Sequence, residues 1–266
     1  MAPSRRTGWL VAESARVGLF LLLLLLLPVV AFAQTTETLT LRGRAQTLHL
    51  SGPSGGYPVV VSSGDGGWIH LAPQVATMLA ARGFFVVGFD SKAYLESFTR
   101  GATTLTTTNV PADYRELVRF AGTRSPGKPL LIGVSEGAAL SLLAATEPAT
   151  KAMVAGVIGL GLGDANELGW RWNDALIYLT HGVPNEPRFS TIAVAGRVAP
   201  TPLAVINSTH DEFVSAGEAE RIMSAAQPPK RLWMVEAADH RFSDKQTELA
   251  ARLVEAIDWI RKNEPK

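Results

Sequence analysis

The sequence predicts an α/β fold with a mostly parallel central sheet, helices on both faces of the sheet and a short lid. Three observations lead to this prediction. Short apolar runs lack the polar alternation of a strand with one solvated face, and stretches of helical length separate these runs. The chain has 266 residues, of which 47% are hydrophobic, and this suits a single domain of the α/β class.

The apolar runs are typical of strands that are buried on both faces. They comprise residues 59–61, 84–87, 130–132, 154–160, 203–206 and 232–235. Helix-length stretches occupy residues 71–82, 111–121, 137–146, 216–226 and 245–262. This β-α alternation predicts parallel strands, and right-handed crossovers place the helices on both faces of the sheet.

A hairpin precedes this pattern, and two less regular segments interrupt it. Residues 36–50 alternate between apolar and polar side chains around Gly43, which predicts two antiparallel strands. The Thr-rich segment 99–109 and the segment 164–197 match no regular element. Both follow strands, so we expect them at the carboxyl edge of the sheet, where open α/β sheets bind ligands. We interpret residues 164–197 as the lid.

Residues 1–33 have the three-part pattern of a secretory signal peptide. Arginines at positions 5, 6 and 16 precede an apolar run over residues 17–33, which ends in the small-x-small pattern Ala31-Phe32-Ala33. The run contains Pro28 and is shorter than the ~20 residues of a typical membrane span. We therefore expect cleavage after residue 33 and export of residues 34–266 as one periplasmic or secreted domain. The paired arginines leave twin-arginine export open beside the general secretory route.

Composition excludes several classes of function. The 25 Lys and Arg residues balance 24 Asp and Glu residues, so the chain lacks the excess of positive charge that nucleic-acid binding requires. The absence of cysteine excludes disulfide scaffolds, thiol nucleophiles and Cys-ligated metals. We expect no nucleic-acid partner, and no motif in the sequence calls for a cofactor or a metal ion.

A serine lies at the turn between a predicted strand and a predicted helix. Gly133-Val134-Ser135-Glu136-Gly137 follows the apolar run 130–132 and leads into the helical stretch 137–146, which is the context that the pattern G-x-S-x-G requires. A sharp turn strains the serine backbone, and glycines two residues away on either side avoid collisions. The pattern predicts that Ser135 is the nucleophile of an α/β-hydrolase fold. The alternative is a serine that only caps the helix.

A serine hydroxyl needs a base to remove its proton and an acid to orient that base. His240 lies between the last predicted strand and the last predicted helix, and Asp211 follows the strand at 203–206. The chain order Ser135, Asp211, His240 is that of α/β-hydrolases, so these residues form the predicted catalytic triad. Glu212 is an alternative acid, because its carboxylate can accept the same hydrogen bond.

Acyl transfer also needs two backbone N–H groups that stabilise the oxyanion. One comes from the residue after the nucleophile, which is Glu136. The glycine-rich segment Ser63-Gly64-Asp65-Gly66-Gly67-Trp68 follows the strand at 59–61, and we expect the second N–H to come from Asp65 or Gly66. The alternative for this segment is a tight turn without a role in ligand binding.

Two motifs and the serine turn together resemble a known family. The motifs are S-G-D-G-G-W at residues 63–68 and Val87-Gly88-Phe89-Asp90-Ser91, which is followed by Tyr94. With the G-x-S-x-G turn, they resemble the bacterial VirJ and AcvB virulence-protein family, most clearly over residues 57–148. The resemblance implies an exported α/β-hydrolase in which Ser135 is the nucleophile and the backbone of residues 64–66 contributes to the oxyanion hole.

The same resemblance also implies a class of substrate. The AcvB branch is associated with hydrolysis of the aminoacyl ester of lysyl-phosphatidylglycerol, so it implies an aminoacyl-phospholipid ester here. The chain departs from the family where Glu136 follows the serine, because the family tends to have an aromatic residue there. Glu136 and the tryptophans at 170 and 172 suggest a pocket for an amine-bearing substrate with an apolar portion. The alternative is that Glu136 only begins a helix and the tryptophans only pack the lid.

These observations predict a serine hydrolase that cleaves an ester bond through an acyl-enzyme. Its partners are a small-molecule or lipid ester substrate and, in transient contact, membrane lipid. Two alternatives remain. One is a non-catalytic periplasmic interaction module of a virulence or secretion system, and the other is a general carboxylesterase or lipase.

Overall fold

The computed structural model describes residues 34–172 and 186–265. The predicted signal peptide at residues 1–33 lies outside these residues, and so does the part of the predicted lid at 173–185. None of the helices in the described ranges combines the length and the apolarity that crossing a bilayer demands.

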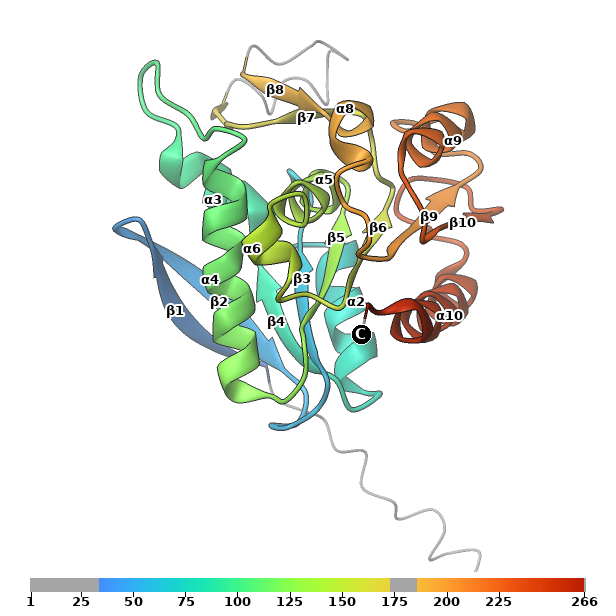
Figure 1. Cartoon of the computed structure of the whole chain (residues 1–266), viewed down its shortest axis with the longest axis horizontal. Coiled ribbons are helices and arrows are strands. Elements are labelled where there is room, and N and C mark those ends of the chain that lie inside the picture. Colours follow the sequence, from blue (N-terminus) through green and yellow to red (C-terminus); the bar gives the residue numbers. More distant parts are fainter. Residues whose placement is uncertain (1–33, 173–185, 266) are drawn as a thin grey trace, which may run out of the picture. The chain divides into compact units, whose positions relative to one another are not determined.

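Eight of the described strands form one sheet in the order β1-β2-β4-β3-β5-β6-β9-β10 (Figure 1). The pairs β1-β2 and β2-β4 are antiparallel, and every other pair in this sheet is parallel. The strands are β1 (Thr35–Leu41), β2 (Arg44–Ser51), β3 (Pro58–Ser62), β4 (Phe85–Phe89), β5 (Leu130–Val134), β6 (Gly156–Leu160), β9 (Leu203–Ser208) and β10 (Lys230–Val235). The leading hairpin and the mostly parallel sheet are both confirmed.

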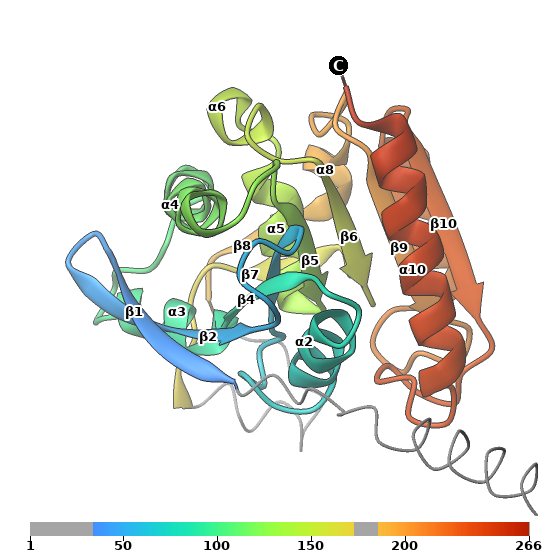
Figure 2. The ribbon, with the colours of Figure 1, turned by 90° about the horizontal axis from the view of Figure 1, so that it is seen from below.

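Helices cover both faces of this sheet. Figure 2 shows α2 and α10 on one side of the strands, and α4, α5 and α6 on the other. The described helices are α2 (Leu71–Ala80), α3 (Ser91–Phe98), α4 (Asn109–Arg124), α5 (Glu136–Ala144), α6 (Pro148–Lys151), α8 (Thr191–Ala195), α9 (Ala216–Ala225) and α10 (Gln246–Asn263). Helix α3 was not predicted, although Asp90 at its N-cap accepts a hydrogen bond from the backbone N–H of Ala93.

The central strands are apolar throughout because each face meets its own hydrophobic core. In β3, Val60 packs in the core that α4 and α5 cover, whereas Val59 and Val61 pack in the core beneath α2 and α10. All three valines are completely buried. This arrangement explains why the sequence of the strand shows no polar alternation.

An ion pair holds the β1-β2 hairpin against the helical layer. Arg42, in the turn of the hairpin, donates hydrogen bonds to Asp113 on α4, with Nη2 to Oδ2 at 2.7 Å and Nε to Oδ1 at 2.9 Å and to Oδ2 at 3.1 Å. The hydroxyl of Tyr94 donates to the same carboxylate at 2.7 Å. Asp113 is buried, and this pairing supplies the partners that a buried carboxylate needs.

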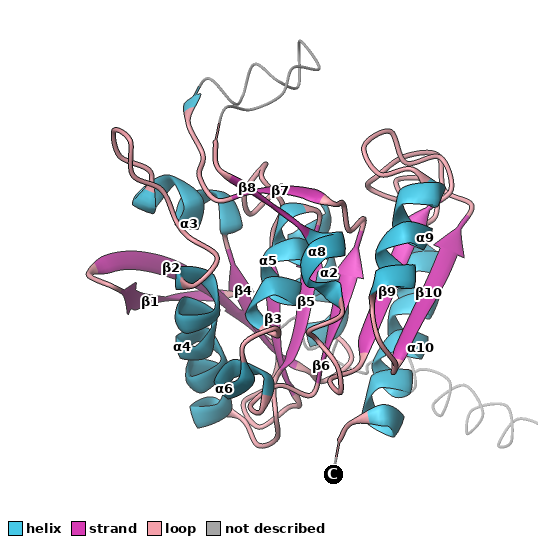
Figure 3. Ribbon diagram, turned by 45° about the horizontal axis from the view of Figure 1, so that its top comes forward, coloured by secondary structure: helices cyan, strands magenta, loops and turns pink. Residues whose placement is uncertain are grey.

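The predicted lid contains regular structure within its described residues. β7 (Ala165–Glu167) pairs antiparallel with β8 (Arg188–Ser190), and α8 follows directly. In Figure 3 this two-stranded ribbon lies at the end of the sheet toward which the arrow of β6 points. Contacts between β7 and α5 place it next to the start of that helix. The described part of this segment therefore lies at the carboxyl edge, as expected.

Candidate active site

Ser135 occupies the strained turn that the sequence predicts. Its backbone has φ 53° and ψ −120°, and it occupies the N-cap position of α5 directly after β5, where its side chain makes no capping hydrogen bond. A Cβ added at Gly133 would lie 2.2 Å from the carbonyl oxygen of Gly137, and one added at Gly137 would lie 2.2 Å from that of Ser63. Both glycines are therefore required for this turn, and the strain lifts the serine out of the strand.

Asp211 and His240 come together from the ends of β9 and β10. The Nδ1 atom of His240 lies 2.7 Å from Oδ2 of Asp211. The other carboxylate oxygen accepts the backbone N–H groups of Phe213 at 2.9 Å and Val214 at 2.8 Å. Because an ionised carboxylate only accepts hydrogen bonds, this contact places the ring proton on Nδ1 and leaves Nε2 as the basic atom.

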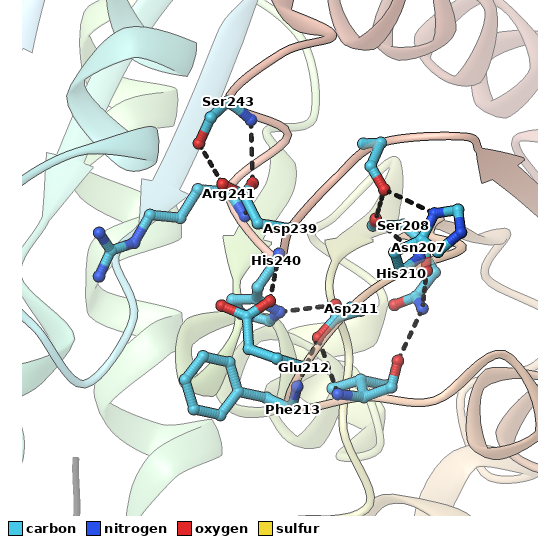
Figure 4. Close-up of polar contacts among 12 residues, drawn as sticks. Asn207, Ser208, His210, Asp211, Glu212, Phe213, Asp239, His240, Arg241 and Ser243 are labelled. Atoms are coloured by element: carbon cyan, nitrogen blue, oxygen red, sulfur yellow. Dashed lines mark hydrogen bonds and ion pairs between the residues drawn. The ribbon is translucent and has the colours of Figure 1, made fainter. Parts of the chain in front are cut away.

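Glu212, the alternative acid, has a different contact. Its Oε2 atom accepts the backbone N–H of His240 at 2.8 Å and does not bond the imidazole ring (Figure 4). Asp211 thus holds the side chain of His240, and Glu212 holds its backbone. The ring of Phe213 meets the imidazole edge-on, with centroids 5.3 Å apart. The different contacts of Asp211 and Glu212 could not be predicted from the sequence, because two adjacent carboxylates are equivalent in the chain.

Ser135 and His240 both contact the backbone at the end of β6. The backbone N–H of Ser135 donates to the carbonyl of Leu160 at 2.8 Å. Gly161, the next residue, lies directly against the ring of His240. The Nε2 atom of His240 is buried and has no hydrogen-bond partner among the described residues. Catalytic hydrogen bonds of this kind often tighten only when substrate binds.

Gly161 was also missed at the sequence level. The signal that could have found it is the spacing of Gly159, Gly161 and Gly163 at the end of a buried strand. Glycine inside or directly after a strand often marks a close approach of another chain segment or a ligand.

The glycine-rich segment lies beside the nucleophile. A Cβ added at Gly64 would lie 3.3 Å from Cβ of Ser135 and 3.9 Å from its Oγ. Within the described part of the chain, no backbone acceptor is found for the N–H groups of Asp65, Gly66 and Glu136. These three groups are the predicted oxyanion donors, and that role stays a prediction.

The two family motifs form a packed joint that fixes this segment. A Cβ at Gly88 would lie 2.2 Å from the ring of Trp68, so only glycine accommodates the indole. The Oγ atom of Ser63 accepts the backbone N–H of Ser91 at 3.0 Å. On its other face, Trp68 stacks on His49 with centroids 4.8 Å apart. The residues of the two motifs therefore hold the loop 63–68 against β4 and the start of α3.

Three carboxylates gather near the nucleophile. Burial, followed by the charges of Asp65 and Glu167, raises the pKa of Glu136 well above its usual range. A hydrogen bond from the backbone N–H of Glu167 to Oε1 of Glu136, at 3.0 Å, opposes this rise. The described residues contain no cluster of three His, Asp or Glu side chains suited to a metal ion.

The lid tryptophans have unequal environments. Trp170 is buried, whereas Trp172 is 77% exposed, and their rings meet edge-on at 5.9 Å. The ammonium group of Lys92, on α3, lies 4.2 Å from the ring centroid of Trp170. The backbone N–H of Trp170 donates to the hydroxyl of Thr99 at 3.0 Å. Thr99, the first residue of the Thr-rich segment, thus contacts Trp170 of the predicted lid.

Comparison with solved structures supports the fold. The chain is similar to the α/β hydrolase GrgF from Penicillium sp., with a TM-score of 0.63, 14% identity and coverage of 87% of this chain and 99% of the other. It is also similar to an esterase domain of a Rhodothermus marinus protein, with a TM-score of 0.58, 22% identity and coverage of 86% and 98%. For a dienelactone hydrolase from Anabaena variabilis, the TM-score is 0.60 and the identity 16%, with coverage of 85% of this chain and 96% of the other. These likenesses confirm the α/β-hydrolase fold.

Sequence comparison gives the family. No relative was found among curated proteins. Residues 57–260 match the family described as bacterial virulence protein (VirJ), and the matched region includes the elbow serine, Asp211 and His240. Since this match covers well over half of the sequence, the chain belongs to the VirJ family of bacterial virulence proteins.

Proposed function

We propose that this protein is a serine hydrolase that cleaves a carboxylic ester through an acyl-enzyme. The observation that carries the proposal is the convergence at the end of β6. The strained Ser135 bonds to the carbonyl of Leu160, and the Asp211-His240 pair lies against the following glycine. A fold alone does not demand a serine, an acid and a histidine at three separate strand ends.

The chemistry follows from these positions. His240 accepts the hydroxyl proton of Ser135 at Nε2 while Oγ forms a bond to the ester carbonyl carbon. The carbonyl oxygen becomes negatively charged, and the N–H groups of Glu136 and of Asp65 or Gly66 donate to it. Collapse of this intermediate breaks the bond to the alcohol, which takes the proton from the imidazolium. Water then attacks the acyl-enzyme by the same route and releases the acid.

Active-site labelling tests the proposal. We expect a fluorophosphonate probe to modify the native protein at Ser135, because only an activated serine reacts rapidly with such a phosphorus centre. Peptide mapping by mass spectrometry identifies the modified residue, and heat-unfolded protein is the control. Failure of the native protein to react, or reaction at another serine, would rule out this nucleophile and favour the non-catalytic interaction module.

We further propose that the ester belongs to an aminoacyl phospholipid. Membership of the VirJ family supports this class, as does the group of carboxylates around Glu136 beside the nucleophile. A cationic aminoacyl group is attracted to negative charge, more so where little water screens it. We also propose that the protein acts outside the cytoplasm, because residues 1–33 have the pattern of a cleaved signal peptide.

The carboxylates make amine recognition dependent on pH. Because the pKa of Glu136 is raised, its side chain is neutral at low pH and gains charge as the pH rises through that pKa. We therefore expect the ratio of kcat/KM for a 6-aminohexanoyl ester to that for the matched hexanoyl ester to increase with pH. Glu136→Gln should lower this ratio and remove its dependence on pH. Equal rates for the two esters at every pH would contradict amine recognition while leaving ester hydrolysis intact.

A further inference from the structure

Gly161 lies against the imidazole of His240, and the residue before it, Leu160, bonds to the backbone of Ser135. It follows β6 with φ +60°, and its N–H donates to the carbonyl of Ile206 on β9 at 3.0 Å. A Cβ added here would lie 2.4 Å from Cε1, 2.9 Å from Nδ1 and 3.2 Å from Nε2 of His240. Real Cβ atoms do not approach a ring to 2.4 Å, so the imidazole occupies the space that a side chain would need.

The preceding residue ties the same segment to the nucleophile. The carbonyl of Leu160 accepts the backbone N–H of Ser135, and the carbonyl of Ile206 fixes the N–H of Gly161. The backbone at residues 160–161 therefore contacts both the serine turn and the imidazole ring of His240.

A second contact fixes the base from a different direction. Glu212 accepts the backbone N–H of His240 at 2.8 Å, independently of the bond between Asp211 and the ring. His240 is buried in this arrangement, and the edge-on ring of Phe213 covers another part of the imidazole. Figure 4 shows Asp211, Glu212 and Phe213 gathered around His240 from one loop.

We propose that Gly161 and Glu212 are positioning residues for His240. Gly161 provides the space in which the imidazole lies within reach of the nucleophile, and Glu212 anchors the backbone from which the ring extends. Both residues act through His240, and neither supplies a group to the chemical step. This inference deepens the proposed hydrolase function and rests on it, because the position of the ring matters for catalysis only if His240 is the base.

A matched pair of alanine variants distinguishes the effect of a collision with the imidazole from the effect of backbone strain at positive φ. Gly161→Ala introduces both a collision and a side chain at positive φ. Gly83→Ala introduces only the second, since Gly83, in the turn between α2 and β4, has φ +85° and no atom within 4 Å of the Cβ position. We expect Gly161→Ala to lower kcat and the rate of fluorophosphonate capture by about 10²-fold with little change in KM, because small displacements of a base have effects of this size. Gly83→Ala should retain the wild-type rates.

The Glu212 contact is tested by a conservative variant. We expect Glu212→Ala to lower kcat about tenfold, in line with the loss of one charge-assisted hydrogen bond. Glu212→Gln retains an oxygen that can accept the N–H of His240, and should restore most of the rate. This pair also decides the outcome if Gly161→Ala does not fold.

Proton NMR provides a readout that does not require catalysis. The Nδ1 proton shared with Asp211 should give a strongly downfield resonance in the wild type and in Ser135→Ala, and Gly161→Ala should shift or abolish it. The inference fails if Gly161→Ala matches Gly83→Ala in rate and spectrum, or if Glu212→Gln is as slow as Glu212→Ala. If the resonance responds as expected but Ser135 does not react with the probe, the positioning holds and the proposed function is wrong.

Discussion

Replacing Ser135 with alanine is expected to reduce kcat for any ester that this protein hydrolyses by about 10⁶-fold. The variant retains the elbow glycines, the Asp211-His240 pair and the predicted oxyanion donors, but it has no atom that can form the acyl-enzyme. Turnover should then fall close to the background rate, leaving at most the contribution of binding and of the oxyanion donors. Steady-state kinetics on a chromogenic ester measures this loss.

A second serine variant serves as the control for this loss. Ser224→Ala removes an exposed hydroxyl from α9, which bonds only to the carbonyl of Glu220. It should leave kcat unchanged, whereas Ser135→Ala should retain the wild-type melting temperature but lose turnover. Near-normal activity of purified Ser135→Ala would refute the assignment of the nucleophile.

Replacing Asp211 with asparagine should lower kcat by about 10⁴-fold. The carboxylate now accepts the Nδ1 proton of His240 at 2.7 Å and also accepts the backbone N–H groups of residues 213 and 214. An amide in this place can turn its NH₂ group toward the ring, which favours the tautomer that is protonated on Nε2. In that tautomer the imidazole cannot take the proton of the serine, so kcat falls while KM changes little.

The acid assignment also has a matched control. Asp258→Asn makes the same chemical change on the exposed face of α10 and should leave the rate unchanged. The measurement is kcat for the two variants on one ester. If Asp211→Asn kept most of the activity, the orienting acid would have to be another group.

Local patterns in the sequence were sufficient to predict the framework of the molecule. Strands buried on both faces have apolar runs, so the alternation of central strands and helices along the chain could be predicted. The elbow was predictable because its strain requires glycine at 133 and 137, where added Cβ atoms would strike backbone oxygens at 2.2 Å. The pairing of Asp211 with His240 was predictable from their places after two strands.

What could not be predicted depends on contacts between distant residues. Gly161 became informative only when the ring of His240 was found against it, 79 positions later in the chain. Glu212 could not be distinguished from Asp211, because the choice depends on the direction in which a loop turns. The pairing of β7 with β8 was missed because each strand has only three residues, too few to show a period.

The joint between Trp68 and Gly88 bears on how the family motif should be used to classify other proteins. Its residues pack an indole against a strand and bond a loop through a buried hydroxyl, so they determine the structure of the loop and take no part in chemistry. A chain that kept this joint but lost the elbow serine would still build the same loop. Detecting the motif in a genome therefore predicts the structure of this loop. Only the residues at positions equivalent to 135, 211 and 240 can indicate whether a protein with that structure is also a hydrolase.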